Sequence, residues 1–137
     1  MERSHVSFAP TPENGLCPVR GAVRDQLARW GRGELVDDAL LVVSELLGNA
    51  FGHGTTPVRL SLALHGRAGH QSLMIQVSDT SPGFDTKAIR AAWTRPSAAL
   101  SGGGRGLLLV EALSRAWGDR HYRRGHTVWA DLPSRIA

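Results

Sequence analysis

The chain has 137 residues, a length that fits one domain (residues 1–137) able to bury a core without disulfides or metal ions. Its net charge is +4, but the arginines are scattered, so the sequence lacks the basic stripe typical of a nucleic-acid binder. A single cysteine, Cys17, excludes an internal disulfide framework and a cysteine-rich zinc site. No apolar run approaches the roughly 20 residues of a membrane span and the polar start is no signal peptide, so we expect a cytoplasmic protein.

The first part of the chain predicts a short strand and two helices. Residues 1–18 form an amino-terminal arm, in which 5–9 have a strand pattern that two prolines end. Over 19–30, apolar residues recur at helical spacing and glycines follow, which predicts a first helix. Apolar residues at i, i+3, i+4 and i+7 spacing predict a central helix over 34–54, on which the first helix packs.

The main strands of the sheet are predicted from two hairpins. In 58–64 every second residue is a large aliphatic, which is the alternation of a half-buried strand. Residues 72–79 follow a glycine turn and are apolar and β-branched, so the two stretches form an antiparallel hairpin. Residues 121–123 and 127–132, joined through Gly125, indicate a closing hairpin.

Two more helices are expected between these hairpins. Residues 86–93 are a short helical candidate, and 96–104 have the small residues and glycines of a mobile loop. From Gly106 an amphipathic helix is expected to reach Ala116. These elements predict an α/β (α+β) domain in two layers, with helices packed on a sheet.

A polar row on the central helix is the first candidate site. Glu45, Asn49 and His53 follow one another at i, i+4 and i+8, which stacks a carboxylate, an amide and an imidazole. Polar side chains that are buried need a hydrogen-bonding partner, and a bound ligand can supply it. The row is therefore a hypothesis for a ligand-binding site. Each residue also has a structural interpretation: Glu45 as a solvated residue, Asn49 as a structural amide, and His53 as a partner of the helix dipole.

The glycine-rich run 102–106, directly before a helix, is a candidate phosphate site. Glycines let backbone N–H groups approach an anion, and the amino end of the helix adds partial positive charge. A flexible connection is the alternative interpretation. The run is no Walker loop and no dinucleotide fingerprint, because the Gly-Lys-Ser/Thr sequence and the preceding strand are missing.

Asp79 stands at the end of a predicted strand, four residues before Gly83. A turn-forming aspartate, held by local backbone groups, is one interpretation. The other is a carboxylate on a pocket floor that accepts a hydrogen bond from a ligand amino group, such as the exocyclic amine of adenine.

Four segments together resemble, in order and spacing, the N, G1, G2 and terminal boxes of the GHKL ATPases, the superfamily of DNA gyrase and the sensor histidine kinases. They are residues 45–54 (ELLGNAFGHG), 79–83 (DTSPG), 104–107 (GRGL) and 125–129 (GHTVW). The small size and the ending 127–132 are most similar to the stand-alone branch, the anti-sigma factor serine/threonine kinases. The resemblance covers about residues 20–132.

The resemblance implies a Bergerat fold, in which helices cover one face of a mixed, mostly antiparallel sheet, with ATP and Mg²⁺ as cofactors. Asn49 matches the Mg²⁺ ligand and Glu45 matches the catalytic general base. Asp79 matches the adenine-reading aspartate, supported through a water by Thr127, and residues 85–101 match the ATP lid. The implied cofactor contacts are Asn49, His53, Asp79, Gly83, Gly104, Arg105, Gly106, Leu107 and Thr127.

The implied function is a protein kinase that phosphorylates a serine of a STAS-type anti-sigma-factor antagonist and otherwise sequesters a sigma factor. No nucleic acid or membrane is expected to bind directly. The sequence leaves open whether the chain forms a homodimer. Ser81 departs from the family, because many relatives have the first glycine of the G1 box there, and no substrate-docking motif matches. A nucleotide-gated protein-binding module with little turnover is the alternative function, and a basic nucleic-acid binder is a third.

Overall fold

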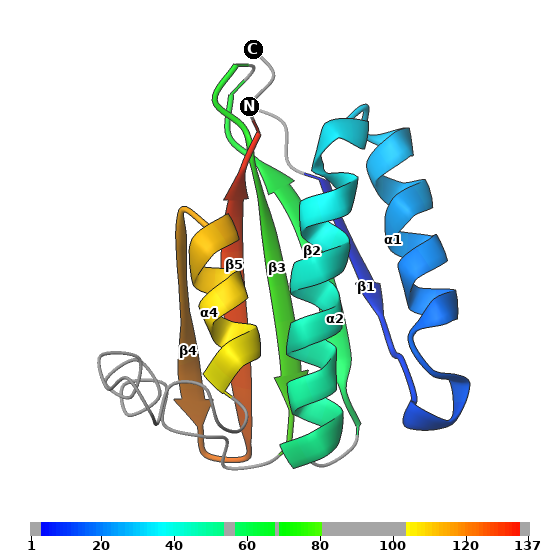
Figure 1. Ribbon diagram of the computed structural model, residues 1–137, viewed down its shortest axis with the longest axis vertical. Coiled ribbons are helices and arrows are strands. Elements are labelled where there is room, and N and C mark those ends of the chain that lie inside the picture. The colour runs from blue at the N-terminus through cyan, green and yellow to red at the C-terminus, as the bar shows by residue number, and fades with distance from the viewer. Residues whose placement is uncertain (1–3, 54–56, 68, 81–103, 135–137) are drawn as a thin grey trace.

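The computed structural model describes residues 4–53, 57–67, 69–80 and 104–134. Within these ranges the chain forms two layers, a sheet and a group of α-helices (Figure 1). None of the described helices is long and apolar enough to cross a membrane. The elements in chain order are β1 (Ser4–Phe8), α1 (Cys17–Arg29), α2 (Val36–His53), β2 (Arg59–His65), β3 (Ser72–Asp79), α4 (Gly104–Leu113), β4 (Ala116–Tyr122) and β5 (Gly125–Pro133), with short 3₁₀ turns at Pro12–Asn14 and Gly33–Leu35.

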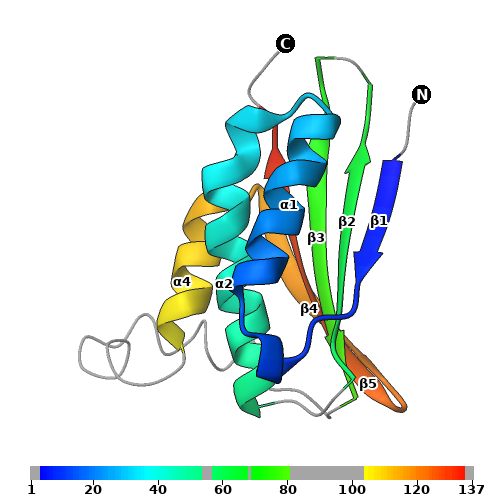
Figure 2. The ribbon, with the colours of Figure 1, turned by 90° about the vertical axis from the view of Figure 1, so that its right-hand side faces the viewer.

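The strands lie in the order β1-β2-β3-β5-β4, and every described pairing is antiparallel. Figure 2 shows α1, α2 and α4 on the same side of this sheet. We call the other side, which these helices leave uncovered, the open face. The predicted two-layer α/β fold, with a mostly antiparallel sheet and helices on one face, is therefore confirmed.

Alternation along the strands decides which side chains meet the helices. In β2, Leu60, Leu62 and Leu64 are buried, whereas the intervening Ser61 and Ala63 belong to the open face because successive side chains point to opposite sides. Paired residues of neighbouring strands share a face, so the same sorting extends across the sheet. The helix-covered face therefore receives the aliphatic residues that the sequence pattern predicted.

Helix α2 occupies the middle of the helical layer, as predicted. It contacts α1, α4 and the central strand β3, and Val43 and Leu47 are completely buried. Each such aliphatic side chain contributes about 1.5–3 kcal/mol by leaving water. Arg20 of α1 also donates a hydrogen bond of 2.6 Å to the Ser44 hydroxyl of α2. The position of α2 is thus fixed by packing on three sides.

The boundaries predicted around α4 and β4 are wrong. The helix expected to run from Gly106 to Ala116 begins at Gly104 and ends at Leu113, and Ala116 starts β4, which is longer than the predicted 121–123. Pairing with β5 explains the difference, because the Arg115 N–H donates to the Asp131 carbonyl and the next residues pair along β5. Sheet pairing thus overrides the helical pattern of this stretch.

Two other predicted segments are not described. The short helix at 86–93 lies outside the described residues, as does 96–103 of the predicted loop. Of the segment 79–83, only Asp79 and Thr80 are described.

Two glycine-to-alanine substitutions test the backbone. Gly21 lies inside α1 with open space around it, so Gly21→Ala should stabilise the fold by about 0.5–1 kcal/mol. Gly66 has φ +103°, and an added Cβ would lie 2.5 Å from the His70 carbonyl oxygen. Gly66→Ala should therefore destabilise by more than about 1 kcal/mol. Urea unfolding measures both changes, and an unchanged midpoint for Gly66→Ala would contradict the turn geometry.

Candidate functional site

The segments that carry the predicted site residues meet at one end of the molecule. Strand β3 ends there at Asp79, α4 begins there at Gly104, and the last turn of α2 and the β4–β5 turn lie beside them (Figure 1). The ends of secondary-structure elements present unpaired backbone groups, which is why ligands bind there so often. The fold therefore brings together the described parts of all four sequence segments of the candidate site.

Glu45 and Asn49 lie one turn apart on α2 and are both partly buried. The row continues to His53, the last residue of α2, whose side chain lies outside the described part of the chain. One turn before Glu45, Leu41 lies on the same side of α2 and is 44% exposed. The polar row therefore lies between an exposed turn of α2 and the end of the helix where the other site segments meet.

The Glu45 carboxylate lies directly against Gly106 of α4. A Cβ added at Gly106 would lie 3.0 Å from Glu45 Cδ and would overlap with Oε2. Gly106 is a residue of the first turn of α4, where backbone N–H groups have no partner inside the helix. A carboxylate of the polar row thus lies beside the amino end of the helix that follows the glycine-rich run.

The Asn49 amide is the clearest sign of a ligand site. Its Nδ2 atom is buried and has no hydrogen-bond partner among the described residues. A buried donor without an acceptor costs about 1–3 kcal/mol. A phosphate oxygen would satisfy this donor, and the side-chain carbonyl oxygen of the same residue is a suitable Mg²⁺ ligand.

Asp79 ends β3 on the helix-covered face. It follows the buried Ile75 and Val77 at every second position of the strand and so shares their face, and its Cα partner is His126. The backbone of β5 approaches closely here, because a Cβ added at Gly125 would lie 2.7 Å from the Asp79 carbonyl oxygen. A side chain other than that of glycine at 125 would push these strand ends apart.

The structure does not bring Thr127 to the side of Asp79. Thr127 pairs with Ser78, and the two hydroxyl oxygens are 2.7 Å apart on the open face. His126 is the residue of β5 that stands beside Asp79 on the helix-covered face, and it is 2% exposed. His126 stands two residues before the buried Val128, so both side chains point to the same face of the strand. This alternation was the signal in the sequence that could have identified His126.

The glycine-rich run enters α4 directly. Gly104, Arg105 and Gly106 form the first turn of α4, and the side chain of Arg105 lies outside the described part. The side chain of Leu107 is completely buried in the core, so Leu107 can offer a ligand only its backbone. Gly83 and the predicted lid at 85–101 are not described.

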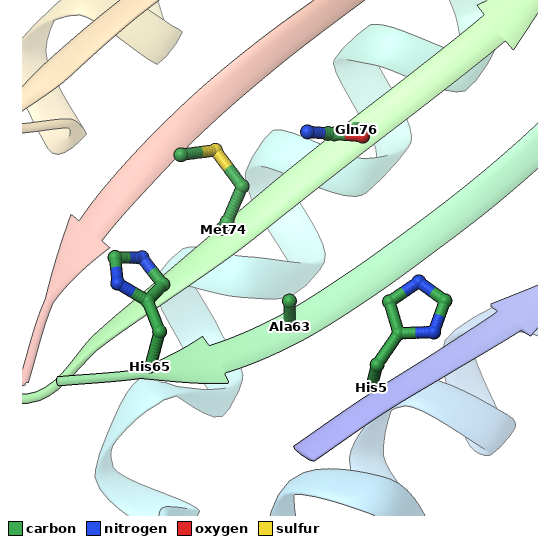
Figure 3. A pocket seen from close by; sticks show the side chains of 5 residues that line it. All are labelled: His5, Ala63, His65, Met74 and Gln76. Carbon is green, nitrogen blue, oxygen red and sulfur yellow. The ribbon is translucent and has the colours of Figure 1, made fainter. Parts of the chain in front are cut away.

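A separate hollow of about 350 Å³ lies on the open face (Figure 3). Strand alternation places its residues on the side of the sheet opposite to Asp79, so the hollow does not belong to the candidate site. Its lining is formed by His5, Ala63, His65, Met74 and Gln76.

Comparison with protein families gives a match over most of the chain. The family model of the histidine kinase-like ATPase domain matches residues 8–131. Comparison with the curated proteins found no match. The matched range includes the complete polar row of α2, the end of β3, the start of α4 and the terminal hairpin.

The contact between Glu45 and Gly106 can be tested by a double-mutant cycle. Gly106→Ala should destabilise by about 1–3 kcal/mol, because the added methyl group overlaps with the Glu45 carboxylate. In the Glu45→Ala background the same substitution should cost clearly less, since the overlapping atoms are gone. Urea unfolding of the four proteins gives the coupling energy. Equal costs in both backgrounds would mean that the two residues are not in contact.

Proposed function

The chain belongs to the histidine kinase-like ATPase family, and from this premise we propose that it is an ATP-binding serine/threonine kinase that acts as an anti-sigma factor. Its substrate would be a serine of an anti-sigma-factor antagonist. The observation that carries the proposal is the position of the Glu45 carboxylate against Gly106 at the start of α4. This position puts a carboxylate that can act as a general base beside backbone N–H groups that can bind phosphate.

The residues present fit a Mg²⁺–ATP complex. Domains of this family bind ATP, usually with Mg²⁺. Three groups would supply the contacts. Asn49 Nδ2, which has no partner in the part of the chain that the structure describes, supplies a donor, the first turn of α4 an anion site and the Asp79 carboxylate an acceptor for adenine. Mg²⁺, held in part by Asn49, would neutralise phosphate charge when bound.

The proposed reaction transfers the γ-phosphoryl group from ATP to a serine hydroxyl of the partner. The serine oxygen forms the new bond to phosphorus, the bond to the β-phosphate oxygen breaks, and ADP leaves. Glu45 accepts the proton of the serine hydroxyl. The backbone N–H groups of residues 104–106 would hold the phosphates and orient them in line with the attacking oxygen.

The regulatory part of the proposal rests on the resemblance of the sequence to the stand-alone anti-sigma kinases. The chain would bind a sigma factor in one state and its STAS-type antagonist in the other, in the cytoplasm, where ATP is available. A nucleotide-gated binding module without turnover would use the same site. The two differ in whether the Glu45 carboxylate receives a proton.

The adenine contact predicts one binding measurement. Asp79→Asn should weaken ATP binding by about 1–3 kcal/mol, because the substituted amide turns a donor toward the adenine amine. Asp25→Asn, an exposed carboxylate on α1, is the matched control and should leave binding unchanged. Calorimetry at fixed Mg²⁺ measures both. If Asp79→Asn binds ATP as tightly as the wild type, Asp79 is only a turn residue.

Two substitutions on α2 separate catalysis from binding. Glu45→Gln should keep Mg²⁺–ATP affinity within a few fold but lower phosphate transfer by about 10²- to 10⁴-fold, the usual effect of removing a general base. Asn49→Ala should lose affinity as well as transfer. Asp37→Asn, an exposed carboxylate at the start of α2, is the control.

The assay measures labelled phosphate on an antagonist encoded by a neighbouring gene. Transfer by Glu45→Gln at the wild-type rate would contradict the general base. Nucleotide-dependent binding of the antagonist without any transfer by the wild type would support the binding module in place of the kinase.

A further inference from the structure

A cluster of two histidines and one aspartate lies on the β4–β5 hairpin, outside the predicted ATP contacts. Its members are Asp119, His121 and His126, each of which offers one ligand atom, and these atoms lie within 4.8 Å of one another. The sequence pattern did not bring them together, because their proximity depends on the strand register.

The register places the three side chains on one face. Asp119 and His121 are alternate residues of β4, and His121 pairs with His126 of β5. The face is the helix-covered one, because Asp119 pairs with the buried Val128. Two antiparallel strands therefore hold the cluster, and neither has to move for all three to meet.

One nitrogen of each ring, the Nε2 atom, points at the same carboxylate oxygen. His121 Nε2 and His126 Nε2 each lie 2.8 Å from Asp119 Oδ2, and the ring centroids are 4.6 Å apart at an interplanar angle of 33°. One imidazole would suffice for an ordinary ion pair. Two imidazoles and a carboxylate that point at one spot form the donor set of a divalent transition-metal ion.

Burial changes stepwise across the cluster. The side chain of His126 is 1% exposed, that of Asp119 is 12% exposed, and that of His121 is 53% exposed. The inner ligands are held by the surrounding protein, while the outer one leaves a route for an ion from solvent. This is the arrangement of a site with three protein ligands and an open fourth position.

We propose that Asp119, His121 and His126 form a binding site for a divalent transition-metal ion, with Zn²⁺ as the best match. Metal bonds of about 2.0–2.2 Å to nitrogen and oxygen require only that the three atoms separate slightly around the ion. Mg²⁺ does not fit, because it prefers oxygen ligands in octahedral geometry. The site is independent of the proposed kinase activity, although it lies beside Asp79 through the pairing of His126.

Binding would join β4 to β5 at the end of the sheet where the ATP site is proposed. The ion would replace hydrogen bonds between side chains by coordinate bonds, and it would hold His126 in a fixed orientation. Metal binding should therefore stabilise the folded chain by an amount that rises with the logarithm of the free Zn²⁺ concentration above the Kd.

The test is a titration of the full chain with Zn²⁺, without nucleotide and with excess Mg²⁺, in competition with a chromogenic chelator. The background carries Cys17→Ser, which removes the exposed thiol. We expect one tightly bound Zn²⁺ per chain. His121→Ala should lower the affinity by about 10-fold or more, since even an outer-shell partner of a metal ligand contributes about 10- to 100-fold.

His70→Ala is the matched control, because His70 is exposed in the β2–β3 turn and far from the hairpin in the sequence. It should bind Zn²⁺ as the background protein does. Asp119→Asn, which keeps the shape of the side chain, should also lose affinity. Circular dichroism verifies the fold, and His121 is exposed enough for its alanine variant to remain folded.

Nitrogen NMR of the imidazoles gives a second reading. Zn²⁺ should shift the Nε2 signals of His121 and His126 and leave those of His70 unchanged. Equal Zn²⁺ affinity of the background protein and His121→Ala, or no binding at micromolar Zn²⁺, would overturn the proposal and leave a hydrogen-bonded cluster. The test does not measure kinase activity. A failure of the metal-site proposal is therefore distinguishable from a failure of the proposed function.

Discussion

Helix α2 has to fill the centre of a core while it carries a polar row. It packs against α1, α4 and β3, and Val43 and Leu47 are completely buried within this contact. The same helix presents Glu45 and Asn49, which are partly buried. The Asn49 amide nitrogen enclosed there has no acceptor in the described ranges of the chain, and such a buried donor destabilises a fold unless a ligand supplies an acceptor. This is the environment in which we propose that a nucleotide binds.

The sheet and α4 complete that environment from the other direction. The antiparallel order brings the end of β3 next to the start of β5, and α4 begins at the same end of the molecule (Figure 1). Gly106 has to be glycine for Glu45 to lie where it does, and Gly125 has to be glycine for β5 to approach Asp79. Two glycines far apart in the chain therefore allow the two halves of the site to close.

The sequence predicted the parts that depend on local periodicity. Helical spacing identified α1, α2 and the row of Glu45 and Asn49, and alternation identified β2 and β3. It missed the end of α4, because the pairing of Ala116 with β5 is not visible locally. It assigned Thr127 to the support of Asp79, whereas register places His126 there.

Contacts between residues far apart in the sequence could likewise not be predicted from the sequence pattern. The approach of Glu45 to Gly106 depends on how α2 packs on α4, which no spacing within one helix determines. The cluster of Asp119, His121 and His126 requires the register of β4 on β5. The four sequence boxes nevertheless indicated the family, because their order along the chain can be recognised without knowing these contacts.

The central claim, that the buried amide of Asn49 meets a nucleotide, has a direct measurement. The chain contains two asparagines, Asn49 and the exposed Asn14 in the 3₁₀ turn before α1. Protein labelled with ¹⁵N only in asparagine side chains therefore gives two amide signals, one of which is an internal control. Saturating Mg²⁺–ATP should shift the Asn49 signal and leave the Asn14 signal in place. An Asn49 signal that stays unchanged at saturating Mg²⁺–ATP would contradict the account.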